Sequence, residues 1–170
     1  IIRSVIDKGF EFFKLAADHE FNLFIEPHRT EQSNKSILYN LLIARTPSLE
    51  NQVKAVYLLS KITKKSDEIM INAERHLFNL NLTDTFLNEL VTALFSLLQY
   101  FNLNEKISLL QDVLVRKNLL GKTLVKNLWF FGRSENNARC QRLETELIKY
   151  KQELAQSAPA QSEAIAGKEV

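Results

Sequence analysis

Residues 84–101 (DTFLNELVTALFSLLQYF) constrain the fold of this chain more than any other stretch. Read as a helix, they place their polar side chains on one narrow stripe and leave the rest of the surface apolar. That stripe consists of Asn88, Glu89, Thr92, Ser96 and Gln99. A helix that is apolar around most of its girth must be surrounded by other elements. We therefore expect 84–101, capped by Thr83 or Asp84, to be the central helix of a helical domain.

The rest of the chain also favours helices over strands. Only 4 Gly and 3 Pro occur in 170 residues, there is no sustained alternation of period two, and no Asn-Gly or Asp-Gly hairpin signal appears. We predict an all-α fold: a compact multi-helix bundle or short superhelical array of about seven to eight helices. The predicted helices are 1–18, 35–45, 46–62, 66–79, 84–101, 104–119, 122–131 and 135–156.

These helices form one predicted domain, 1–154, followed by a disordered tail, 155–170, which is small, polar and aperiodic. Residue types at the helix ends predict where some of these helices begin and end. Thr46 with Pro47 should start the third helix, and Gly121 should end the sixth in a left-handed conformation. The last helix carries a heptad-like seam that we expect to pack on its own domain. The seam consists of Cys140, Leu143, Leu147, Tyr150 and Leu154.

The tripeptide Gly121-Lys122-Thr123 matches the end of a phosphate-binding loop, but its context does not. The motif needs a glycine five positions before Gly121, where this chain has Arg116, and a preceding strand, where this chain has helical periodicity. The end of one helix at Gly121, followed by the start of the next, explains the tripeptide better. We predict no nucleotide site and no other cofactor.

Candidate catalytic and metal-binding residues are few. His19 and His28 lie near carboxylates in 18–31, yet their spacing matches no metal-ligand pattern, and His76 stands alone. Cys140 lies on the inward seam, where a small buried hydrophobe is the simpler interpretation than a nucleophile. The sequence therefore predicts no catalytic residue, no metal and no small-molecule substrate. An enzyme that uses 18–31 stays an alternative.

Positive charge is concentrated in 105–142, which holds eight cations against three anions although the net charge of the chain is only +2. Three aromatics, Trp129 to Phe131, lie inside this basic region and cannot all face one core, because successive helical residues are about 100° apart. An aromatic beside cations is typical of an interface hot spot. The alternative is that Trp129 and Phe130 pack into the core and hold the helix 122–131 against it. The predicted partner-binding residues are Arg116, Lys122, Lys126, Trp129, Phe131 and Arg133.

The sequence thus favours a helical protein–protein interaction module that binds an acidic partner near 116–133, rather than an enzyme. One alternative is an anionic membrane or phosphoinositide-binding domain that uses the same patch. Another is a regulatory or effector domain of a larger bacterial protein, since the chain starts without Met and its composition is rich in Asn, Lys and Phe. The small basic patch argues against nucleic acid. No transmembrane segment is predicted, and a single cysteine favours a soluble protein of a reducing compartment, such as the cytoplasm.

Overall fold

A computed structural model of the chain describes residues 8–21, 24, 38, 41, 48–63, 83–125 and 133–169. Over these residues the chain is helical and forms no strand; the one β-type pairing is an isolated bridge between Thr63 and Asn118. The predicted all-α fold is therefore confirmed. The helices are α2 (Phe10–His19), α5 (Leu49–Lys61), α7 (Asp84–Leu98), α8 (Leu103–Leu114), α9 (Leu119–Leu124) and α10 (Arg133–Glu169).

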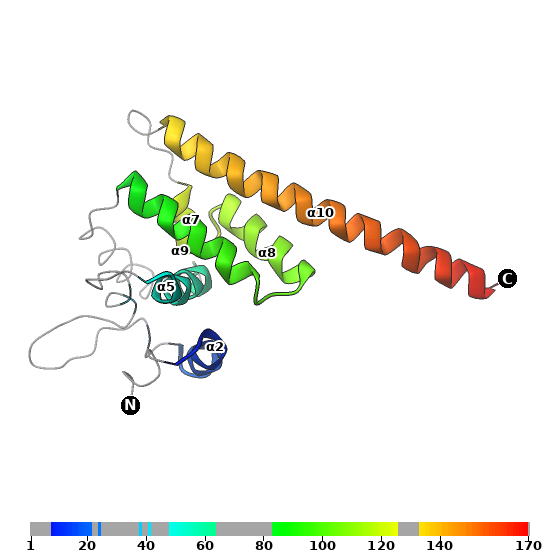
Figure 1. Ribbon diagram of the computed structural model, residues 1–170, viewed down its shortest axis with the longest axis horizontal. Coiled ribbons are helices and arrows are strands. Elements are labelled where there is room, and N and C mark those ends of the chain that lie inside the picture. The colour runs from blue at the N-terminus through cyan, green and yellow to red at the C-terminus, as the bar shows by residue number, and fades with distance from the viewer. Residues whose placement is uncertain are drawn as a thin grey trace, which may run out of the picture.

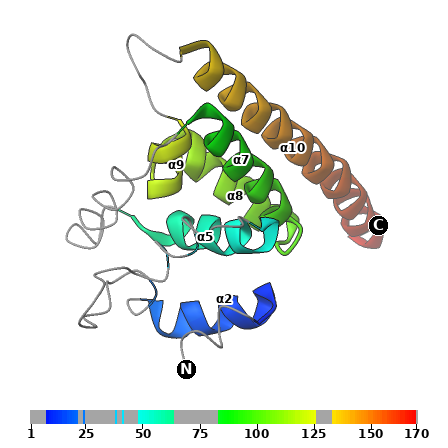
Figure 2. The same ribbon diagram turned by 60° about the vertical axis from the view of Figure 1, so that its left-hand side comes forward.

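The described part of the chain has six helices, so the predicted number of seven to eight is not confirmed. The helix predicted at 66–79 lies outside the described residues, as does that at 35–45 except for Leu38 and Leu41, which are buried. The helices stack in a simple order (Figures 1 and 2): α2 packs on α5, α5 on α7 and α9, and α10 lies over α8 and α7.

Helix α7 has the central place that its sequence predicts. Thr83 caps it, because the Thr83 Oγ1 accepts a hydrogen bond from the Phe86 N–H at 3.2 Å. It packs against α5, α9 and α10. Its buried residues lie on one broad face, opposite the exposed polar residues Asn88, Glu89 and Thr92: Leu87, Leu90, Val91, Ala93, Leu94, Leu97 and Leu98.

Helix α5 is buried even more continuously, which its sequence does not predict. Every residue from Gln52 to Leu59 is buried. Its start also differs from the prediction: Ser48, not Thr46, is the N-cap, and its hydroxyl accepts from the Asn51 N–H at 3.1 Å. Thr46 and Pro47 lie outside the described residues, and the helix begins at Leu49.

The junction of α8 and α9 corrects the predicted role of Gly121. Helix α8 ends at Leu114, and it is Arg116, with a φ of 57°, that takes the left-handed conformation. The Arg116 N–H donates to the Val113 carbonyl and the Lys117 N–H to the Asp112 carbonyl, as in a Schellman helix end. Gly121 lies inside α9 instead, so the predicted seventh helix, 122–131, begins earlier and ends at Leu124.

Helix α10 uses the predicted seam to pack on α8. Leu143 is fully buried and Leu147 and Tyr150 nearly so, whereas Leu154 is 36% exposed. Beyond Tyr150, residues 151–157 are all exposed as the helix runs past the domain (Figure 1). The helix continues to Glu169, which differs from the predicted disordered tail. Five alanines between 155 and 166 favour helix, and polarity alone does not distinguish helix from coil.

Candidate functional site

The structure describes two of the six predicted partner-binding side chains, Arg116 and Lys122. Lys126, Trp129 and Phe131 lie outside the described residues. Arg133 is the first residue of α10, but its side chain is not among those that the structure describes. Arg116 and Lys122 lie on either side of the α8–α9 junction. The two helices approach closely there, since a Cβ built on Gly121 would lie 2.9 Å from the Arg116 Cα. We call residues 115–117 the α8–α9 corner.

Side chains of the α8–α9 corner are exposed. Val115 is 69% exposed, and Arg116 and Lys117 beside it are exposed as well. The Lys117 Nζ lies 3.8 Å from an Asp112 carboxylate oxygen across this helix end. The corner therefore presents an apolar side chain beside two cations.

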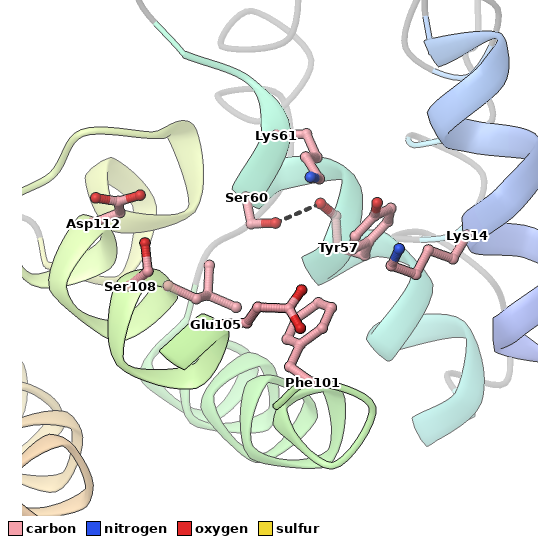
Figure 3. A pocket seen from close by; sticks show the side chains of 9 residues that line it. Lys14, Tyr57, Ser60, Lys61, Phe101, Glu105, Ser108 and Asp112 are labelled. Carbon is pink, nitrogen blue, oxygen red and sulfur yellow. Dashed lines mark hydrogen bonds between the residues drawn. The ribbon is translucent and has the colours of Figure 1, made fainter. Parts of the chain in front are cut away.

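A second feature is a hollow of about 230 Å³ between α2, α5 and α8 (Figure 3). Its polar lining combines two lysines, two carboxylates and two hydroxyls: Lys14, Lys61, Glu105, Asp112, Ser60 and Ser108. These side chains come from three helices that are far apart in the sequence. Because no local motif connects these residues, the hollow cannot be predicted from sequence patterns.

Tyr57 forms one wall of this hollow, and its hydroxyl donates a hydrogen bond to Asp18. Burial raises the pKa of Tyr57 far above its ordinary value, and the hydrogen bond and negative charge of Asp18 raise it further. The phenol is thus held neutral, as a donor. The Nζ atoms of Lys61 and Lys14 lie 5.4 and 5.9 Å from the centroid of its ring.

In the part of the chain that the structure covers, the candidate catalytic residues of the sequence do not come together in a catalytic arrangement. His19 is the exposed last residue of α2, and His28 and His76 lie outside the described residues. Among those described, no three His, Cys, Asp or Glu side chains are grouped so as to hold a metal ion. Cys140 is half-buried, and burial followed by the charge of Glu144 raises the pKa of its thiol, the opposite of what an activated nucleophile needs.

No protein-family model matches the chain, and no curated protein and no solved structure is significantly similar to it. The described residues form an all-α domain with an exposed cationic corner between α8 and α9 and a hollow of mixed charge between α2, α5 and α8. None of the described helices combines the length and apolarity that crossing a bilayer requires.

Proposed function

We propose that this chain is a helical protein–protein interaction module that binds an acidic partner surface through the α8–α9 corner. The binding surface would include Arg116 and Lys122 and extend to the other predicted contact residues, Lys126, Trp129, Phe131 and Arg133. Cations at the edge of such a surface speed the encounter with an acidic partner, and apolar contacts prolong it. Val115 is the exposed apolar side chain available at the corner. The proposal gives the chain a binding role rather than a catalytic one.

The observation that carries this proposal is that Arg116 occupies a backbone conformation that favours glycine. At the residue after a Schellman helix end the backbone is left-handed, and Arg116 has a φ of 57° there. For a residue with a Cβ this conformation costs about 1 kcal/mol or more, whereas glycine adopts it freely. The side chain of Arg116 is exposed and forms no ion pair with any residue that the structure describes. A costly, exposed cation at a position suited to glycine supports a role in recognition.

The variant Arg116→Gly separates recognition from folding. We expect Arg116→Gly to stabilise the domain by about 1 kcal/mol in urea denaturation, because the strained residue is replaced by one that tolerates positive φ. Partner capture, measured by affinity pull-down with mass spectrometry, should be lost at the same time. Lys151→Gly would disturb a helix, so the matched control is Lys151→Ala, which removes an exposed cation from α10 and should retain the captured proteins.

Unchanged capture by Arg116→Gly would contradict the proposal. Flotation with anionic vesicles at two salt concentrations tests the lipid-binding alternative with the same pair of variants. Salt-sensitive flotation that is lost in Arg116→Gly and kept in Lys151→Ala would assign the corner to a membrane surface instead of an acidic protein.

A further inference from the structure

We propose that the hollow between α2, α5 and α8 binds a zwitterionic small molecule of amino-acid size. The ligand carboxylate would face Lys61 and Lys14, and the ligand ammonium would face Glu105 and Asp112. This site adjoins the α8–α9 corner, because Asp112 pairs with Lys117, but no corner residue lines it and it does not depend on the function proposed for the corner.

The charge balance of the lining selects the class of ligand. Lys14 and Lys61 both approach the ring of Tyr57, while Glu105 and Asp112 extend from α8 (Figure 3). A purely anionic ligand would meet two carboxylates, and a purely cationic ligand would meet two ammonium groups. A molecule that carries one charge of each sign can satisfy both walls at once, which is the arrangement that electrostatic complementarity favours.

Two of these four charged side chains, Lys61 and Glu105, can still form an ion pair or a hydrogen bond with a ligand. Lys61 lies over the Tyr57 ring, and in the described residues no ion pair joins it to a carboxylate. Glu105 accepts the Asn102 N–H through Oε1 at 3.3 Å, which leaves its other oxygen available. Lys14 and Asp112 are already engaged, at 3.2 Å with Asp18 and at 3.8 Å with Lys117. Lys61 and Glu105 are therefore the principal contacts in this proposal.

Hydroxyl and aromatic groups complete the site. The Ser60 Oγ donates to the Tyr57 carbonyl at 2.7 Å and can still accept a hydrogen bond from a ligand ammonium. Tyr57 and Phe101 form an aromatic wall with ring centroids 6.5 Å apart. The hydrogen bond from Tyr57 to Asp18 holds this wall in place before any ligand arrives.

The size of the hollow agrees with a small ligand. A volume of about 230 Å³ corresponds to roughly eight water molecules and lies below the range of pockets for drug-sized compounds. An amino acid or a molecule of similar size fits such a volume.

The ligand arm of the test uses the full chain and nuclear magnetic resonance titration with each standard free L-amino acid. We expect at least one of them to shift amide signals of α5 and α8 around the hollow in a saturable way. For that amino acid, the N-acetyl derivative lacks the ammonium and the carboxamide lacks the carboxylate. Each should bind at least about tenfold more weakly, since each loses one charge-assisted contact.

The protein arm uses charge-removing variants with matched controls. Glu105→Gln keeps the capping box at the start of α8, because glutamine serves at that position, yet removes the charge. Lys61→Gln removes the facing cation. Both should weaken binding by about tenfold or more. Glu153→Gln and Lys151→Gln make the same two changes on exposed positions of α10 and should bind as the unaltered chain does.

Three results would overturn the proposal: no amino acid shifts the signals of the hollow, both derivatives bind as well as the parent, or Glu105→Gln and Lys61→Gln bind normally. Each result leaves the role of the α8–α9 corner untouched, because Arg116 does not line the hollow. Loss of partner capture in Arg116→Gly with normal amino-acid binding would likewise separate the two sites.

Discussion

At the scale of single residues, Gly121 and Arg116 exchange the roles that residue type alone predicts. Glycine is needed in two situations, where φ is positive and where two backbones approach closely. At Gly121 the second applies, since a Cβ there would lie 2.4 Å from the Val113 carbonyl oxygen. The buried Asn118 caps α9 at this point, because its Oδ1 accepts a hydrogen bond from the Gly121 N–H at 2.8 Å. Sequence does not distinguish the two situations, because the contact with Val113 is made between two helices.

Gly121→Ala should therefore destabilise the domain by on the order of 2 kcal/mol, because backbone atoms of α8 must move to admit the methyl group. Urea denaturation measures the change. Gly9→Ala is the matched control: nothing lies within 4 Å of its built Cβ, so only the weaker N-cap of α2 is lost and we expect a cost below about 1 kcal/mol. Equal effects of the two substitutions would contradict the close packing of α9 on α8.

At the scale of elements, prediction succeeds where the pattern lies within one helix and fails where burial depends on neighbours. The broad apolar face of α7 can be recognised from the spacing of its own residues. Helix α5 contains Gln52 and Lys54 among its buried residues, and a helical wheel assigns such side chains to solvent. The structure buries them with partners: the Gln52 Nε2 donates to Glu89 Oε2 at 3.1 Å, and the Lys54 Nζ lies 5.7 Å from the centroid of the Phe13 ring.

The seam of α10 gives a prediction at this scale. Leu143→Ala should cost about 3 kcal/mol, because a fully buried side chain is removed and leaves a cavity against α8. Leu154→Ala makes the same change at a site that is 36% exposed and should cost less than about 1 kcal/mol. Denaturation of both variants in urea compares them. If the two losses were alike, α10 would not pack along the domain as described.

At the scale of the whole molecule, Arg139 joins three helices. It is 3% exposed, its Nε donates to the Leu124 carbonyl of α9 at 3.3 Å, and its guanidinium pairs with Asp84 of α7 at 3.1 Å. In the sequence Arg139 is one of the basic residues of 105–142, and no local pattern reveals its partners, which precede it by 15 and 55 positions. The hollow escaped prediction for the same reason, because its lining runs from Lys14 to Asp112.

Arg139→Met should lower the free energy of unfolding by about 2 kcal/mol, because two charge-assisted hydrogen bonds are lost while the half-exposed Asp84 can regain water. Arg142→Met is the control: that side chain is exposed and lies over the Phe95 ring at 5.3 Å, so we expect less than about 1 kcal/mol. Thermal and urea denaturation should rank the two variants in this order. The reverse order would exclude Arg139 as the link between α7, α9 and α10.

The packing of α10 has a mechanical consequence. The helix is anchored between Arg139 and Tyr150, and its remaining 19 residues to Glu169 correspond to about 28 Å of length. For a straight helix of this length, a tilt of about 10° at the anchor carries the far end through roughly 5 Å. Small rearrangements of the side chains beneath the anchor are thereby amplified at a distance from them.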